Sequence, residues 1–163
     1  MNGCLNSMNE IHIYTDGSSR GNPGPGGYGV VLMSGHHRKE LSKGFRLTTN
    51  NRMELLAVIA GLQAIKKQNL PVTIFSDSQY VVNATNKGWL NNWIKTDFKG
   101  GKKNKDLWTE YYELAKSFRV KYVWVKGHAD NPYNNRCDEL ATAAADGKDL
   151  EVDEGYELEV QKK

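Results

Sequence analysis

The sequence contains few cysteines and no long apolar run. Its two cysteines, Cys4 and Cys137, lie far apart, and neither belongs to a Cys-x-x-Cys pair. A disulfide framework and a structural zinc site are therefore disfavoured, and a reducing compartment such as the cytoplasm is favoured. No apolar run approaches the roughly 20 residues needed to cross a bilayer, so we expect no membrane span.

A large excess of one charge is also missing, because 22 Lys and Arg residues balance 19 Asp and Glu residues to leave +3 over 163 residues. The charges are nevertheless unevenly placed. Residues 87–105 hold six lysines against one aspartate, whereas residues 146–163 hold seven acids against three lysines. We expect one domain over residues 10–146 that includes a basic protrusion at 87–105. A flexible, untargeted leader at 1–9 would precede it, and an acidic tail at 147–163 would follow it.

The hydrophobic pattern predicts an α/β fold. Strand-like segments lie at residues 10–16, 28–33, about 40–47, 72–75 and 120–125, and helical periodicity appears at 53–65, from 77, at 107–118 and at 140–145. Three consecutive strands suit antiparallel hairpins, and the later strands alternate with helices. The order predicts a mixed sheet with helices packed on it.

A glycine-rich segment at residues 24–29 formally matches the Gly-x-Gly-x-x-Gly nucleotide-binding pattern. That motif requires a helix after the glycines, whereas a strand is predicted here. The segment also lacks the Gly-Lys-Ser/Thr of a phosphate-binding loop. We therefore interpret these glycines as residues of a tight turn and of a close approach between backbones.

Four carboxylates are candidates for catalysis, although each has a simpler structural explanation. Asp16 could belong to a turn, Asp77 could cap a helix, and Asp138 could be an exposed helical acid. Glu54 follows Asn51 at the spacing of a helix capping box. Taken one at a time, these residues do not indicate a site.

Their predicted positions become informative when they are considered together. Asp16 and Asp77 each close a predicted strand, and Glu54 and Asp138 are each placed in the first turn of a predicted helix, so all four can meet at one sheet edge. Converging carboxylates repel one another unless a hard cation neutralises them. A cluster without His or Cys ligands favours Mg²⁺ or Mn²⁺ over zinc, and two such ions can promote displacement at a phosphodiester.

Five motifs resemble those of bacterial ribonuclease HI, in the same order and from about residue 10 to residue 160. They are Tyr14-Thr15-Asp16-Gly17-Ser18, Gly21-Asn22-Pro23-Gly24-Pro25-Gly26-Gly27-Tyr28-Gly29, Thr48-Thr49-Asn50-Asn51-Arg52-Met53-Glu54-Leu55, Ser76-Asp77-Ser78-Gln79-Tyr80-Val81, and the segment 123–140. The resemblance implies a ribonuclease H-like five-stranded mixed sheet, with three antiparallel hairpin strands followed by two parallel strands. It also implies a magnesium-dependent endonuclease that cleaves the RNA strand of RNA–DNA hybrids and leaves 5′-phosphate and 3′-hydroxyl ends.

The resemblance also implies roles for individual residues. Asp16 would bridge two Mg²⁺ ions, with Asp138 beside the ion that activates water and with Glu54 and Asp77 at the ion that stabilises the leaving oxygen. Mn²⁺ is a possible substitute. His128 matches a histidine on a mobile loop that assists proton transfer or product release.

Recognition of the hybrid would involve several polar residues. By resemblance, Asn22, Asn50, Asn51 and Gln79 would contact the minor groove, where 2′-hydroxyls distinguish RNA from DNA, although Asn50 and Asn51 could equally serve turns and caps. Thr49 and Asn104 resemble a pocket for a phosphate of the DNA strand. Some relatives carry an arginine two residues before this threonine, where the present chain has Leu47.

The basic protrusion resembles a segment that follows the nucleic-acid backbone, and Trp89 is a candidate contact to the DNA strand. Trp89 and Trp93 are four residues apart, which favours packing within a helix over stacking on bases. We expect a monomer. Two alternatives remain at this stage: another nuclease or polynucleotidyl transferase of the same fold, and a hybrid-binding module without catalysis.

Overall fold

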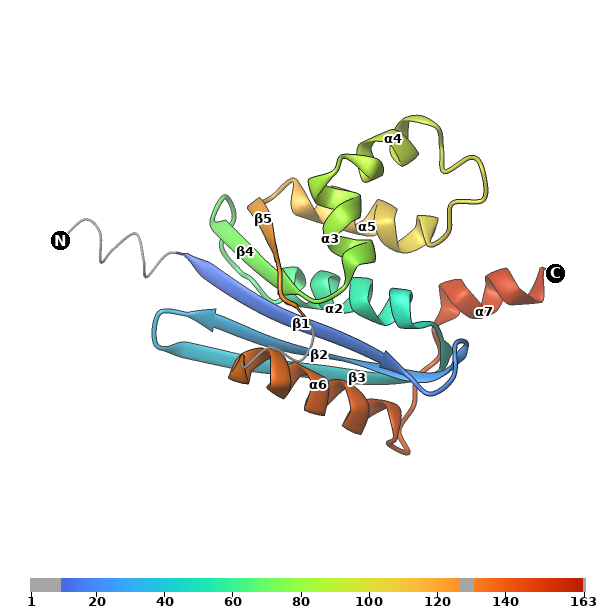
Figure 1. Ribbon diagram of the computed structural model, residues 1–163, viewed down its shortest axis with the longest axis horizontal. Coiled ribbons are helices and arrows are strands. Elements are labelled where there is room, and N and C mark those ends of the chain that lie inside the picture. Colours follow the sequence, from blue (N-terminus) through green and yellow to red (C-terminus); the bar gives the residue numbers. More distant parts are fainter. Residues whose placement is uncertain (1–9, 127–130, 163) are drawn as a thin grey trace.

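The computed structural model describes residues 10–126 and 131–162. Helices cover both faces of a five-stranded sheet (Figure 1). The elements are β1 (Ile11–Ser19), β2 (Gly24–Ser34), β3 (His37–Thr48), α2 (Asn50–Gln63), β4 (Pro71–Ser76), α3 (Gln79–Asn86), α4 (Trp89–Lys95), α5 (Lys105–Ala115), β5 (Arg119–Trp124), α6 (Pro132–Ala145) and α7 (Glu154–Gln161). The predicted leader at 1–9 and His128 lie outside the described residues.

The sheet has the strand order β3-β2-β1-β4-β5. β1, β2 and β3 pair antiparallel, whereas β4 pairs parallel to β1 and β5 pairs parallel to β4. This confirms the predicted mixed sheet. The predicted boundaries were too short, since β1 runs on to Ser19 and pairs with β2 as far as Gly26. Asp16 therefore lies inside a strand and does not close one.

The larger hydrophobic core lies on the sheet face that α2, α3 and α5 cover. Ile13, Val30 and Ile74 project from three adjacent strands and are fully buried. Met53 and Leu62 meet them from α2, again without exposure to solvent. The helical periodicity of residues 53–65 thus identified the correct buried face, although α2 begins at Asn50 and ends at Gln63.

The opposite face of the sheet is covered by α6, which packs on β1, β2 and β3. Its small core contains Tyr14, Val31 and Cys137. A Cβ atom at Gly27 would collide with the carbonyl oxygen of Ala141, and one at Gly29 would collide with that of Cys137. The expected close approach between backbones is therefore confirmed, and it brings α6 against the centre of the sheet.

One further helix begins earlier than predicted, and two helices were not predicted. α6 begins at Pro132, eight residues before the predicted start, because the Asn131 side chain caps it by accepting hydrogen bonds from the backbone N–H of Tyr133 and Asn134. The predicted basic protrusion contains α4, and the predicted acidic tail contains α7. Among the helices that the structure describes, none combines the length and hydrophobicity needed to cross a membrane.

Candidate active site

Three carboxylates meet at one edge of the sheet. Asp16 comes from the centre of β1, Glu54 from the second turn of α2, and Asp77 directly follows β4. One oxygen from each lies within 4.8 Å of the others. Asp16 and Glu54 are 6% and 4% exposed, so two of these acids are almost removed from solvent.

The neighbouring residue Gly17 allows Glu54 to reach this position. A Cβ atom on Gly17 would collide with the backbone of Met53 and Glu54, so only glycine lets α2 pack this closely against β1. The backbone N–H of Gly17 also donates a hydrogen bond of 2.9 Å to Oδ1 of Asp16. Gly17 therefore lets α2 pack closely on β1, and its backbone N–H helps to orient the Asp16 carboxylate.

Asp138 joins the same region from the other face of the sheet. It lines a hollow of about 440 Å³ together with Asp16, Glu54 and Asp77. The placement of Asp138 in a first helical turn was wrong, because the early start of α6 makes it the seventh residue of that helix. The early start also leaves Asp138 beside Asp16, and its side chain is exposed.

The simpler explanations for Glu54 and Asp77 are wrong. Thr49 caps α2, and its hydroxyl accepts the Arg52 backbone N–H at 3.2 Å, so Asn51 and Glu54 form no capping box. Ser78 caps α3 by accepting the Val81 backbone N–H. The side chains of Glu54 and Asp77 therefore do not cap these helices and remain available to the site.

The acids strongly influence one another's protonation. Burial, followed by the neighbouring charges of Asp77 and Asp138, raises the pKa of Asp16 to about 8. Burial also raises the pKa of Glu54 well above its ordinary value, as do the neighbouring charges of Asp16 and Asp77. Strongly shifted pKa values are concentrated in functional sites, where ionisable side chains are buried close together at a cost in stability.

The donor set fits a divalent cation. Oε1 of Glu54 is buried and has no hydrogen-bond partner among the described residues. A buried carboxylate oxygen without a donor is costly, and a cation held between Glu54, Asp16 and Asp77 would satisfy it. Because the ligands are all carboxylates, the site suits a hard cation and not zinc.

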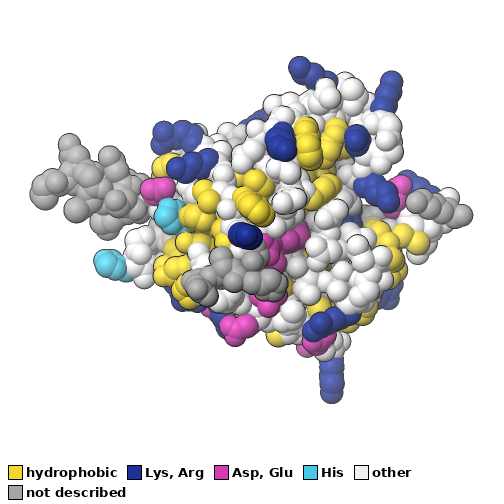
Figure 2. Space-filling view, viewed as in Figure 1, with side chains coloured by type: hydrophobic (Ala, Val, Ile, Leu, Met, Phe, Trp, Pro, Cys, Tyr) yellow, Lys and Arg dark blue, Asp and Glu magenta, His cyan; other side chains and the backbone are white. Residues whose placement is uncertain are grey.

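Most of the predicted minor-groove residues surround the acids. Asn50, Asn51 and Gln79 line the same hollow. Asn22 lies beside them, and its Oδ1 accepts the backbone N–H of Asn50 at 3.1 Å. Figure 2 shows acidic side chains gathered near the middle of this face, with Lys and Arg side chains above them in the region of α4.

The basic protrusion forms a second hollow, of about 610 Å³. Trp89, Trp93, Lys99 and Lys102 are among the residues that line it. The expectation that both tryptophans pack holds for Trp93, whose ring lies 6.0 Å from that of the fully buried Trp108. It also holds for Trp89, whose ring lies 6.5 Å from that of Trp93, although Trp89 remains 42% exposed. An apolar ring flanked by Lys87 at 5.5 Å is therefore open to solvent.

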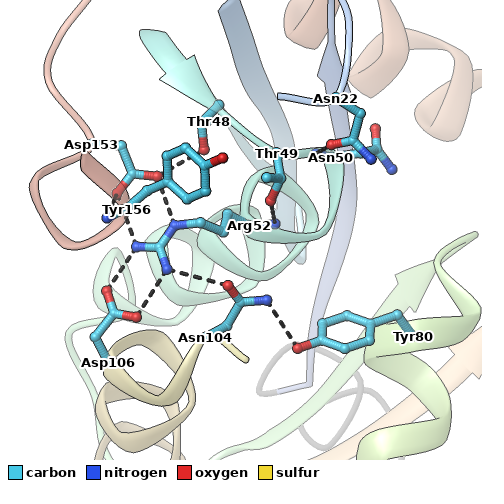
Figure 3. A network of polar contacts seen from close by, with 10 residues as sticks. All are labelled: Asn22, Thr48, Thr49, Asn50, Arg52, Tyr80, Asn104, Asp106, Asp153 and Tyr156. Carbon is cyan, nitrogen blue, oxygen red and sulfur yellow. Dashed lines mark hydrogen bonds and ion pairs between the residues drawn. The ribbon is translucent and has the colours of Figure 1, made fainter. Parts of the chain in front are cut away.

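The residues predicted to grip a phosphate, Thr49 and Asn104, both contact Arg52 (Figure 3). Sequence reasoning assigned no role to Arg52, Asp106 or Asp153. The sequence did indicate that Arg52 is buried. It precedes Leu55, Ile59 and Leu62 by three, seven and ten residues, which places it on the buried face of α2. A buried arginine needs partners, but the sequence does not reveal that they lie 54 and 101 positions away.

Residues 8–146 match the family model described as RNase H. The chain belongs to the ribonuclease H family. It is 54% identical to a ribonuclease H of Syntrophus aciditrophicus, over 90% of this chain and 87% of that protein. It is 53% identical to a ribonuclease H of Desulforamulus reducens, over 90% and 94% of the two chains. The predicted family is confirmed, and so is the prediction of a ribonuclease H enzyme.

Solved ribonucleases H share the fold. The crystal structure of LC9-RNase H1, described as a type 1 RNase H with the type 2 active-site motif, has a TM-score of 0.77 at 30% identity and covers 93% of this chain and 80% of that one. LC11-RNase H1, solved in complex with an RNA/DNA hybrid, has a TM-score of 0.64 at 27% identity, with coverage of 83% and 96%. The ribonuclease H-like fold is thereby confirmed.

Proposed function

We propose that this ribonuclease H hydrolyses the RNA strand of RNA–DNA hybrids with two Mg²⁺ ions and leaves 5′-phosphate and 3′-hydroxyl ends. The observation that carries the proposal is the convergence of Asp16, Glu54 and Asp77 within 4.8 Å, in a hollow that Asp138 also lines. Membership of the family and the relative solved with an RNA/DNA hybrid support the choice of substrate.

The positions of the four carboxylates suggest which ion each of them would bind. Asp16, which interacts with both Asp77 and Asp138, would bridge the two ions, with Asp138 on one side and Glu54 and Asp77 on the other. When bound, the ions activate the attacking water and stabilise the leaving 3′ oxygen. The protein contributes a rigid set of ligands, since β1, α2, β4 and α6 fix their backbones before substrate arrives.

The residues around the acids would select the hybrid. Asn50, Asn51 and Gln79 offer amide groups at the rim of the hollow, where they could engage base edges and the 2′-hydroxyls of the RNA strand. Asn22 would act by holding Asn50 and by contacting the groove. Trp89 and the lysines of the protrusion would follow the DNA backbone, and His128 would assist proton transfer or product release. We further propose that the enzyme is a cytoplasmic monomer.

A cleavage assay tests this function. Purified protein is incubated with a labelled RNA–DNA hybrid, duplex RNA, duplex DNA or branched DNA, with Mg²⁺ or with EDTA. We expect Mg²⁺-dependent cleavage of the hybrid's RNA strand only, and products that a 3′-end-dependent ligase or polymerase accepts without phosphatase treatment. Mn²⁺ in place of Mg²⁺ tests the metal preference.

Two variants accompany this assay. Asp77→Asn should lose at least about a hundredfold in kcat, because a neutral amide cannot replace a charged ligand. Asp149→Asn, at an exposed acid between α6 and α7, should keep the activity of the parent. Full hybrid cleavage by Asp77→Asn would contradict the proposed metal site, and tight hybrid binding without turnover in Mg²⁺ would contradict catalysis.

A further inference from the structure

Arg52 occupies an unusual position for an arginine. Its side chain is only 3% exposed, although it carries a positive charge. Burial of a charge is costly unless it is paired and fully hydrogen-bonded. Arg52 meets this condition with three partners from distant parts of the chain, as Figure 3 shows.

Every N–H of the guanidinium is used. Nε and Nη2 donate to the two oxygens of Asp153 at 2.8 and 2.9 Å. Nη2 and Nη1 donate to the two oxygens of Asp106 at 2.7 and 2.9 Å. The remaining donor of Nη1 points to Oδ1 of Asn104, at 3.3 Å. Because the guanidinium is a planar, rigid fork, two carboxylates fix its plane and thereby fix the direction of the bond to Asn104.

Asn104 has a side chain committed to this network. It occupies the N-cap position of α5 with a left-handed φ of 65°, but its side chain makes no capping hydrogen bond. Its Nδ2 instead donates to the hydroxyl of Tyr80 at 3.1 Å, and the same hydroxyl accepts the indole N–H of Trp108 at 2.7 Å. Arg52 and Tyr80 thus hold the carboxamide from both ends, and the second Nδ2–H has no acceptor in the part of the chain that the structure describes.

Thr49 is the other residue predicted to grip a phosphate of the DNA strand. Its hydroxyl accepts the backbone N–H of Arg52, which leaves the hydroxyl hydrogen available to a ligand. Arg52 therefore connects both halves of the predicted pocket, by its backbone to Thr49 and by its side chain to Asn104. Position 47, two residues before Thr49, holds an uncharged leucine. Binding there depends on neutral donors whose orientation matters.

The network continues into the C-terminal segment. Asp153 caps α7 by accepting the Tyr156 backbone N–H, and it also accepts the hydroxyl of Thr48 at 2.7 Å. Tyr156 places its ring 6.0 Å from the Arg52 guanidinium. The C-terminal segment from Asp153 therefore encloses the side of Arg52 opposite Asn104 (Figure 3).

We propose that Arg52 is a positioning residue for hybrid binding, in that it orients the Asn104 carboxamide toward a phosphate of the DNA strand while Asp153 ties the C-terminal segment to that surface. The inference rests on the proposed function, because the phosphate belongs to the hybrid. Asp106 and Asp153 keep the local charge from being positive, so Arg52 acts through Asn104 and not as a cation facing the phosphate.

Steady-state kinetics on the hybrid test the proposal. Arg52→Lys keeps the charge but replaces a five-donor fork with a single ammonium. It should raise KM roughly 3- to 10-fold, the loss expected for one hydrogen bond, and leave kcat and the Mg²⁺ dependence unchanged. Asn104→Ala should raise KM to a similar extent. In the Asn104→Ala background, Arg52→Lys should raise KM no further, since the group it orients is gone.

A second variant decides the outcome if Arg52→Lys does not fold. The Asp106 side chain is 46% exposed, so Asp106→Asn should fold. Removal of a negative charge near a phosphate site would lower KM by electrostatics alone. The positioning role predicts the opposite, a rise in KM that disappears in the Asn104→Ala background. Asp149→Asn serves as the charge-matched control and should not raise KM.

A destabilising core variant, Val58→Ala, controls for general loss of stability, because Val58 is fully buried in α2 outside the network. It should lower the unfolding midpoint without changing KM. The positioning role is wrong if Asp106→Asn lowers or preserves KM, if the effects of Arg52→Lys and Asn104→Ala simply multiply, or if Val58→Ala raises KM equally. The proposed function fails separately, if the parent protein does not cleave the hybrid.

Discussion

Asp16 lies at the centre of the acidic cluster, and its protonation links the site to the stability of the protein. Burial and neighbouring charges raise its pKa to about 8 in the folded state, against 3.8 for an unperturbed aspartate. Between these values the folded chain keeps a proton that the unfolded chain has lost. Without a divalent cation, stability should therefore fall as pH rises from about 4 to about 8.

Asp16→Asn removes this titration. In EDTA at pH 8 we expect the variant to be more stable than the parent by roughly 1–3 kcal/mol, less than the full shift implies because Glu54 and Asp77 remain adjacent. At pH 4.5 the difference should be small. Urea unfolding at the two pH values measures it, with Asp149→Asn as control. Equal stability of parent and variant at pH 8 would show that the carboxylates do not repel one another in the folded chain.

At the scale of elements, the contact between α6 and the sheet decides where Asp138 lies. The contact requires glycine on β2, since the backbone of α6 occupies the space that a side chain would need at Gly27 and Gly29. The same helix carries Asp138, so helix packing and the geometry of the proposed metal site depend on one interface. A small displacement of α6 should therefore affect catalysis more than binding of the hybrid.

Gly27→Ala tests this dependence. The added methyl group must push α6 away, and we expect a loss of about 1–3 kcal/mol in unfolding free energy, typical of an overpacked core. A shift of α6 by about 1 Å should also lower kcat up to a hundredfold, with KM little changed. Gly147→Ala, after the end of α6, is the comparison variant and should retain kcat. An unaltered kcat in Gly27→Ala would mean that Asp138 is not positioned by this contact.

At the scale of the whole molecule, the C-terminal segment belongs to the folded domain. The sequence predicted an acidic tail at 147–163 that follows the domain. The structure places Asp153 against Arg52 with only 5% exposure. The Glu151 backbone also pairs with β3, where its carbonyl accepts the Arg46 N–H and its N–H donates to Gly44. The segment thus extends the fold beyond residue 146, where the family match ends.

Asp153→Ala should consequently be costly. It leaves the buried Arg52 with one carboxylate, and breaking a buried ion pair costs about 3–5 kcal/mol. Asp106→Ala, which removes the more exposed partner of the same arginine, should cost clearly less. Thermal and urea unfolding of both variants provide the comparison. If the two losses were equal, burial would not set the strength of these pairs.

Much of the site could be predicted from the sequence because its residues lie in local motifs. Asp77 follows a short apolar strand and Glu54 lies near the start of a helix that apolar residues at helical spacing predict, so both could be assigned to the correct sheet edge. Asp138 was placed on a helix, but in the wrong turn, because Pro132 and Asn131 were not identified as a helix start. The exposure of Trp89 could not be predicted from its spacing to Trp93.

The sequence by itself determined the mixed sheet through its hydrophobic periodicity. Its motifs, through their resemblance to ribonuclease HI, predicted the class of enzyme and named four carboxylates as candidate metal ligands. Only the tertiary structure decided that a C-terminal aspartate and Asp106 enclose Arg52 and that Arg52 holds Asn104. These partners are separated by 52 to 101 positions, and charged residues carry no local pattern that reveals a distant partner. Folding brings them together, because a buried guanidinium is tolerated only where all its donors are satisfied.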